Sequence, residues 1–541
     1  MKSIYRLVNA IALAATFALP ATLLSQEHEH HHPIGRLGRV VFPVSCTPVA
    51  QRRFEHAMAL LHSFWWEEDD RAFGEVLKAD STCAMAYWGL ALSAWGNPFV
   101  GGPTGDRLTK GAEAAARASA LASRTARERG FISASAALYR DAESTPNSAR
   151  MQAYADTMAR LYRRFPRDVE VAIYYALSQV ATAPRTDTTF AQQRRAIAIL
   201  EPLFARHPNH PGLAHYVIHA TDSPRLAQLG LNAARRYAQI APAAPHAQHM
   251  PSHIFIRLGL WKETIASNWK SYQASYDYAR AMGIPGTIEE FHAMDYAVYA
   301  YLQRGQDSAA RLAVAKAMRA RPNLQGLITD YNRTAMAARI PLERDDWAGA
   351  AELRAPAESL GPVATALFRF TRAVGSARSG RVEAAAPEVS ALDSIASALE
   401  QKGEPYWSRI VRIKHDAADA WTRLAQGDST GALALARAAA DSEEVTDKHQ
   451  ITPGELLPAR ELEGDMLLLA GHYPEARAAY RATLAREPNR ARSLFGVARS
   501  AELAGERRAA ASAYREFLQL MAKADGGRRE VVMANEFMRS R

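Results

Sequence analysis

Apolar residues recur along this chain at the spacing of one helix face, and no stretch of useful length alternates between apolar and polar residues as a half-buried strand would. The pattern predicts short helices arranged in pairs, such as residues 65–80 followed by 83–95. Glycines mark the end of the first helix of a pair, as at Gly259 and Gly305, and loops rich in Pro, Gly, Ser or Thr interrupt the series. We therefore expect an all-α protein with about two thirds of its residues in helices and almost no sheet.

The C-terminal part repeats itself with a period of 34 residues: Gly471, Ala476 and Tyr480 are matched by Gly505, Ala510 and Tyr514. Small residues let two helices approach each other, and the aromatic ring fills the space between them. Each pair buries its apolar stripe only by stacking on its neighbours, so the chain should form a solenoid of helical hairpins.

This period and this order of residues resemble the tetratricopeptide repeat (TPR). Three runs are also similar to a bacterial group of exported TPR proteins with the motif His-x-x-His-Met-Pro-Ser-His. They begin at Cys83 (Cys-Ala-Met-Ala-Tyr-Trp-Gly), His246 (His-Ala-Gln-His-Met-Pro-Ser-His-Ile-Phe) and Pro458 (Pro-Ala-Arg-Glu-Leu-Glu-Gly-Asp-Met-Leu-Leu). The resemblance implies a right-handed superhelix with irregular insertions and a concave groove for ligands, and it implies no particular activity.

The N-terminus has the features of an export signal. Lys2 and Arg6 supply positive charge, residues 8–24 are mostly apolar, and small residues near Ala21 and Ser25 offer cleavage points. No later segment approaches the roughly 20 apolar residues that cross a bilayer. We therefore expect a periplasmic or secreted protein without a transmembrane segment after cleavage. The predicted parts are a signal peptide (1–25), a His-rich tail (26–45), an N-terminal array with the histidine groove (46–300), a C-terminal array (301–525) and a C-terminal tail (526–541).

Charge and cysteine content narrow the partners and the compartment. The net charge is +10, but the basic residues are scattered among acidic ones, which favours a mixed-charge surface and no nucleic-acid partner. The two cysteines, Cys46 and Cys83, would meet an oxidising environment after export. We predict that they form a disulfide between the start of the mature chain and the first repeat.

Eight of the 17 histidines lie between His207 and His292. His215 and His219 are four residues apart, as are His249 and His253, and this spacing places both rings of a pair on one helix face. The pairs are 34 residues apart, so they should point the same way from neighbouring hairpins. The predicted wall of the groove comprises His215, His219, His246, His249, His253, His292 and Asp295, with Tyr216, Arg257 and Tyr299 as further ligand contacts.

Three interpretations of this cluster remain open. The rings could satisfy carbonyl groups between packed helices. They could bind a transition metal, since imidazoles with a carboxylate suit Zn, Cu, Fe or Ni, and an open position would allow hydrolysis or oxidation. They could also hold an anionic ligand without a metal. Pro251, between the second pair, should kink or break its helix. Its neighbour Ser252 lacks any motif that would activate it as a nucleophile.

The tail offers a second candidate metal site, at His28, His30, His31 and His32. Cleavage after Ser25 would make His28 the third residue, and a free amine, two amide nitrogens and that ring suit Cu(II). For the whole protein we expect an exported TPR scaffold that binds a protein, peptide or small ligand in its groove. The alternative is a transition-metal-binding protein or metal-dependent enzyme that uses the central histidines.

Overall fold

The computed structural model describes residues 35–121, 123, 125–319, 326–355 and 359–540. Helices account for 73% of these residues, and none of them forms a strand. From the N-terminus the helices are α1 (Pro48–His62), α2 (Trp66–Ala79), α3 (Ala84–Trp95), α4 (Gly105–Ala120), α5 (Ala126–Tyr139), α6 (Asn147–Arg164), α7 (Val169–Ala181), α8 (Ala191–Arg206), α9 (Pro211–Thr221), α10 (Ala227–Ile240), α11 (Pro245–His249), α12 (Pro251–Arg257), α13 (Trp261–Ala281) and α14 (Ile288–Gln303).

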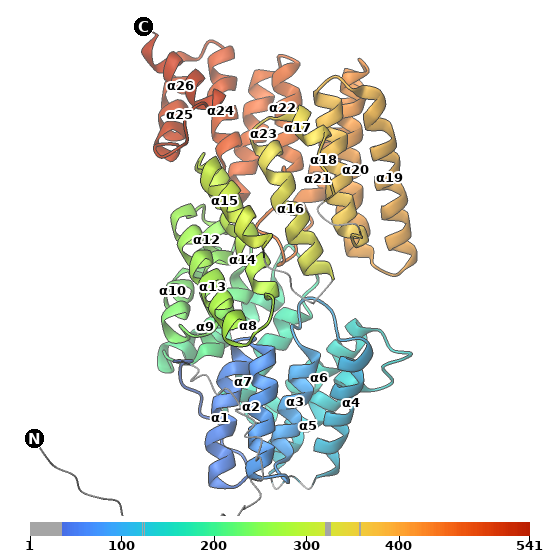
Figure 1. The fold of residues 1–541 in the computed structure, drawn as a ribbon, viewed down its shortest axis with the longest axis vertical. Coiled ribbons are helices and arrows are strands. Elements are labelled where there is room, and N and C mark those ends of the chain that lie inside the picture. The colour runs from blue at the N-terminus through green and yellow to red at the C-terminus, as the bar shows by residue number, and fades with distance from the viewer. Residues whose placement is uncertain (1–34, 122, 124, 320–325, 356–358, 541) are drawn as a thin grey trace, which may run out of the picture. The chain divides into compact units, whose positions relative to one another are not determined.

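The remaining helices continue to the C-terminus: α15 (Asp307–Ala317), α16 (Leu327–Glu343), α17 (Trp347–Ala351), α18 (Pro362–Arg378), α19 (Val382–Gln401), α20 (Pro405–Ala425), α21 (Ser429–Glu444), α22 (Ala459–Leu469), α23 (Tyr473–Arg486), α24 (Ala491–Leu503), α25 (Arg507–Leu520) and α26 (Arg529–Arg539). Helices that follow one another in the chain lie side by side, as Figure 1 shows. The predicted all-α fold of stacked hairpins is therefore confirmed.

The C-terminal hairpins pack as the repeat predicts. Tyr480 of α23 is buried, and its ring fills the space left by two glycines on the neighbouring helices. A Cβ added to Gly464 of α22 or to Gly496 of α24 would lie 2.9 or 2.5 Å from that ring. Gly471 ends a helix with φ of +80°, in the left-handed region that glycine adopts without strain. Small residues and one aromatic thus fix how close the helices lie.

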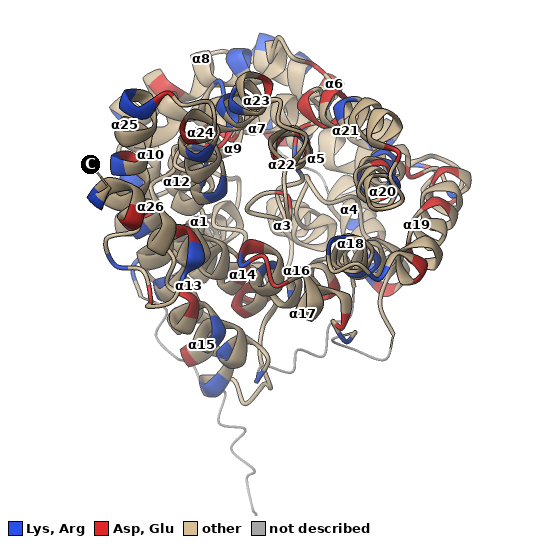
Figure 2. Ribbon diagram, turned by 90° about the horizontal axis from the view of Figure 1, so that it is seen from above, with Lys and Arg blue, Asp and Glu red and all other residues tan. Residues whose placement is uncertain are grey.

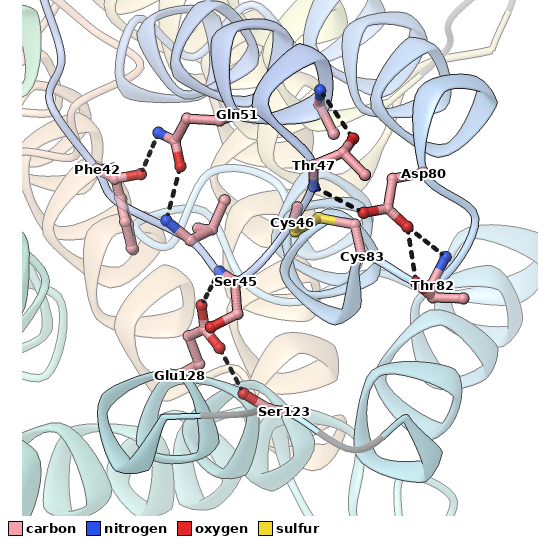
Figure 3. Close-up of a disulfide and its surroundings, with 12 residues drawn as sticks. Phe42, Ser45, Cys46, Thr47, Gln51, Asp80, Thr82, Cys83, Ser123 and Glu128 are labelled. Carbon is pink, nitrogen blue, oxygen red and sulfur yellow. Dashed lines mark hydrogen bonds between the residues drawn. A yellow bond between two sulfur atoms is a disulfide. The ribbon is translucent and has the colours of Figure 1, made fainter.

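The predicted disulfide is present. Cys46 precedes α1, Cys83 precedes α3, and their Cα atoms are 5.2 Å apart (Figure 3). Next to the bridge, the backbone amide of Thr47 donates to Asp80 at 2.9 Å. The start of the described chain is thereby attached to the first hairpins.

Lysines and arginines mix with aspartates and glutamates over the helices, as Figure 2 shows. No described helix is long and apolar enough to span a membrane.

The predicted signal peptide and the tail histidines at 28–32 lie outside the described residues. From Gly35 onward the chain forms a single compact unit, so the predicted division at residue 300 stays a prediction. Part of the predicted C-terminal tail is helical, as α26.

Candidate metal centre

The histidines of the central cluster lie in the interior of the hairpins. They come from neighbouring helices: His215 and His219 from α9, His246 and His249 from α11, His253 from α12 and His292 from α14. None of the six is more than 8% exposed. They form two groups whose ring nitrogens lie within 4.8 Å of one another. We call His215, His219 and His246 site A, and His249, His253 and His292 site B.

Each site combines one pair with a histidine of the next hairpin. This third histidine is His246 in site A and His292 in site B, and it comes three residues before His249 or Asp295, respectively. The ring centroids of His215 and His246 are 5.0 Å apart, and those of His249 and His292 are 4.3 Å apart. The two groups also adjoin each other: the ring centroids of His219 and His253 are 6.3 Å apart, and those of His246 and His249 are 6.1 Å apart. The 34-residue spacing thus places two groups of three rings one step apart along the stacked hairpins, because each pair is completed by a histidine of the next hairpin.

In site B, both histidines of the pair donate their Nδ1 protons to acceptors outside the site. Nδ1 of His249 donates to Oδ1 of Asn268 at 2.6 Å, and the amide of Asn268 is oriented because its Nδ2 donates to the carbonyl of Thr264 at 2.8 Å. Nδ1 of His253 donates to Oδ2 of Asp222 at 2.9 Å. The Nε2 atoms of His249 and His253 are 3.0 Å apart. In the neutral rings, two lone pairs therefore face each other.

A proton shared between these two nitrogens would convert one ring to a charged imidazolium. The buried surroundings disfavour this charge. Burial lowers the pKa of His249 well below its usual value, and the neighbouring His292 and His253 lower it further. Burial also lowers the pKa of His253, and the hydrogen bond that its ring donates to Asp222 only partly offsets this by raising the pKa. A metal cation bound by both lone pairs removes the repulsion without protonating either ring.

The third histidine of site B completes a set of ring nitrogens around the same point. Nδ1 of His292 lies 3.3 Å from the side-chain amide of Asn332, whose Oδ1 has no partner among the described residues. If the amide is rotated by half a turn, that oxygen accepts the Nδ1 proton, and Nε2 of His292 keeps its lone pair for the site. Tyr296 lies on the same helix, with its hydroxyl 3.4 Å from Nε2 of His253.

Site A repeats this arrangement in part: two of its rings have acceptors, whereas Nδ1 of His219 is buried without a partner among the described residues. Nδ1 of His215 donates to the backbone carbonyl of His62 at 2.7 Å, and Nδ1 of His246 donates to Oε1 of Glu289 at 3.1 Å. Nε2 of His246 is buried and has no partner in the described structure. The Nε2 atoms of His215 and His219 are 3.0 Å apart. Carboxylates and carbonyls that accept the distal proton are the usual second shell of metal-binding histidines.

The series of sites ends at α9 because there is no space for a further ring. Gly212 stands where His246 stands one hairpin later. A Cβ added to Gly212 would lie 2.4 Å from Nδ1 of His62, whose ring occupies this position.

At the other end, Asp295 takes the place that His249 has one hairpin earlier. Its Oδ1 accepts a hydrogen bond from Nε of Arg339 at 2.9 Å, and both side chains are fully buried. Asp295 thus belongs to an ion pair and to neither group of three histidines, while its Oδ2 is buried without a partner among the described residues.

A third group of potential ligands satisfies itself without a metal. Oε2 and Oε1 of Glu170 lie 3.1 and 2.9 Å from Nε2 of His62 and of His210. Burial raises the pKa of Glu170, but the two histidines outweigh this and hold it below its usual value. We interpret this group as structural. Sequence reasoning missed it, because its three residues share no spacing.

The remaining predicted contacts do not line an open groove. Tyr216, Arg257 and Tyr299 are each at most 8% exposed. Their polar groups are occupied by protein partners: Tyr216 by His62, Arg257 by Asp222 and Asp447, and Tyr299 by Glu487 and Arg490. The expected groove wall is thus an interior packed between helices.

Comparisons with known proteins add little to this description. No family model matches the chain, and no curated protein matches it. Among solved structures, the yeast Tom70 crystal structure aligns with 90% of this chain and 95% of its own at 9% identity and a TM-score of 0.35. A monomeric IFIT1 mutant with Gppp-AAAA aligns with 80% of this chain and 90% of its own, at 10% identity and a TM-score of 0.34. Similarity at this level carries no functional argument.

Proposed function

We propose that this protein is exported and that it binds transition-metal ions, one in site A and one in site B. The observation that carries the proposal is the pair of Nε2 atoms 3.0 Å apart in site B, with both Nδ1 protons donated elsewhere. Packing alone gives no reason to hold two buried lone pairs against each other. A bound cation does, and neutral imidazoles suit Zn, Cu and Fe.

The second supporting observation is the repetition of the site. Site A has the same construction one hairpin earlier, with an independent set of acceptors for two of its rings. Three protein ligands at each ion leave a position free for a further ligand, as in metal sites that exchange ligands or catalyse.

The test is elemental analysis of the full chain without an affinity tag. The tail histidines must first be replaced by alanine so that they do not contribute metal: His28, His30, His31 and His32. We expect about two ions per chain, about one after either His215→Gln or His249→Gln, and almost none in the double variant. His415→Gln, on α20 and outside both sites, is the matched control. Circular dichroism verifies that each variant keeps its helices.

The proposal is refuted if the metal content does not depend on His215 and His249. It is also refuted if the chain binds no ion and gains no thermal stability from Zn, Cu or Fe salts. In that case the hairpins would remain a TPR-like scaffold for a protein, peptide or small ligand.

A further inference from the structure

The two histidine sites share one short helix. His246 of site A and His249 of site B stand three residues apart on α11, a spacing that places the Cβ atoms of two helical residues about 5–6 Å apart. The ring centroids of these two histidines are 6.1 Å apart, and those of His219 in site A and His253 in site B are 6.3 Å apart. Sites A and B therefore meet at two pairs of rings.

These distances allow two bound ions to share a ligand. A metal ion lies about 2.0–2.1 Å from the imidazole nitrogen that binds it, and the ions of two-metal sites are about 3.5–4 Å apart. The ring spacing between His219 and His253 is compatible with this separation. The six rings can therefore form a binuclear centre in which each ion has three protein ligands.

The charge around the six rings favours metal ions of low charge. All six imidazoles are buried, and neutral rings bring no negative charge to a bound ion. Two carboxylates accept protons from these rings: Asp222 pairs with Arg257, and Glu289 has no ion pair with a lysine or arginine among the described residues. Because a charge is costly to bury, two monovalent ions fit this interior better than two divalent ones. Among Zn, Cu and Fe, copper is the metal with a stable monovalent state.

The closed interior limits what can bind to such a centre. None of the six rings is more than 8% exposed, so a charged ligand would have to lose its hydration to enter. A cavity of about 40 Å³ adjoins site A, lined mainly by aromatic and aliphatic side chains such as Phe64, Trp95 and Leu177. The ring centroid of Phe64 is also 4.4 Å from that of His215. Apolar cavities take up small apolar molecules such as xenon, so a small apolar gas has a place next to the centre.

We infer that sites A and B form one binuclear copper centre, which binds dioxygen between its two ions. Each Cu(I) ion gives up one electron and becomes Cu(II), and dioxygen takes both electrons and becomes a bridging peroxide. No proton or further reductant is needed. Because dioxygen enters as a neutral molecule, the total charge of the buried centre is the same before and after the transfer. This inference rests on the proposed metal binding and adds its substrate.

The experiment uses the full chain with the tail histidines replaced and with Cu(I) added in the absence of oxygen. When dioxygen is admitted, we expect uptake of about one molecule per two copper ions, since both ions bind the same ligand. Two Cu(II) ions that share a ligand couple their spins. The oxygenated chain should therefore lack the electron paramagnetic resonance (EPR) signal of isolated Cu(II), and flushing with argon should release the dioxygen and return Cu(I).

Single-site variants test whether both ions are needed. His249→Gln leaves site A, and His215→Gln leaves site B. Each should still bind Cu(I) but lose the uptake of dioxygen, because one Cu(I) ion supplies only one electron. Any Cu(II) that forms in these variants should show its full EPR signal. His415→Gln is the matched control and should behave as the parent chain, and circular dichroism verifies that each variant keeps its helices.

The inference is overturned if copper fills both sites without uptake of dioxygen, or if the oxygenated chain shows the full EPR signal of two separate Cu(II) ions. Single-site variants that take up as much dioxygen per ion as the parent chain would also overturn it. A chain that binds Zn²⁺ in both sites but has no affinity for Cu(I) would overturn the inference and leave the proposed function intact. A chain that binds no ion in either site would instead refute the proposed function.

Discussion

At the scale of single residues, each imidazole depends on which of its nitrogens keeps the proton. Asn268 and Asp222 accept the Nδ1 protons of His249 and His253, so the Nε2 atoms point at each other as bases. Burial acts in the same direction, because it disfavours the charged ring. It lowers the pKa of five of these histidines: His215, His219, His249, His253 and His292, the last to about 3.

This lowering has a predictable consequence for the metal-free protein. The unfolded chain has histidines with a pKa near 6.5, so below that pH it binds more protons than the folded chain does. The free energy of unfolding should therefore fall as the pH decreases from about 6.5 to 5, and should show no such histidine contribution above about 7. Urea unfolding at pH 7.5, 6 and 5 measures this.

The variant with both His215→Gln and His249→Gln is the control, and we expect it to lose less stability over the same range. The comparison is needed because buried carboxyl groups act with the opposite sign. Burial and the neighbouring Glu455 raise the pKa of Glu443 to about 8, and this contribution is common to both proteins. Equal acid sensitivity in the two proteins would contradict the prediction.

At the scale of elements, periodicity predicted the helices and the grouping of the histidines. A spacing of four residues within a pair and 34 between pairs is set by the hairpins themselves, so it is visible in the sequence. The acceptors are not visible, since Asn268 lies on the second helix of its hairpin and Asp222 in a turn. Asp295 was in register with the pairs, but a distant partner, Arg339, determines its role.

The predicted break at Pro251 is confirmed, and it has a local compensation. Pro251 begins α12, and the amide of His253 donates to Met250 at 3.1 Å and not to the carbonyl of His249. The hydroxyl of Ser252 donates to that carbonyl at 2.7 Å. Ser252 thus supplies the hydrogen bond that the helix break removes next to a ligand of site B.

Ser252→Ala should therefore destabilise the protein by about 1–3 kcal/mol, the cost of leaving a buried carbonyl without a partner. Urea unfolding measures the difference. Ser394→Ala on α19 is the matched control, because Ser394 also donates to a backbone carbonyl, but on an exposed helix face. We expect this control to change stability by less than about 0.5 kcal/mol. A Ser252 variant as stable as the Ser394 variant would show that the break needs no compensation.

At the scale of the whole molecule, the segment between α21 and α22 covers the histidine sites. The hydroxyl of Tyr296 donates to the carbonyl of Gln450 at 2.8 Å, and Arg257 pairs with Asp447 at 2.9 Å. Residues almost 200 positions apart in the sequence therefore enclose one site. Local periodicity carries no information about such contacts, which is why the expected open groove is a closed interior.

Arg339 of α16 connects Asp295 of α14 with the segment between α21 and α22. Besides its ion pair with Asp295, it donates to the carbonyls of Gly454 and Glu455 at 2.8 and 2.9 Å and to the hydroxyl of Thr452 at 3.1 Å. Arg339→Met would leave a buried carboxylate unpaired, so we expect a loss of about 3–5 kcal/mol in the free energy of unfolding. Adding Asp295→Asn removes the stranded charge, and the double variant should recover part of that loss.

The metal content of Asp295→Asn alone should equal that of the parent chain, because Asp295 faces Arg339. Loss of one ion from this variant would instead assign Asp295 to a metal site. In the stability experiment, a double variant no more stable than Arg339→Met would exclude the unpaired carboxylate as the cause of the destabilisation.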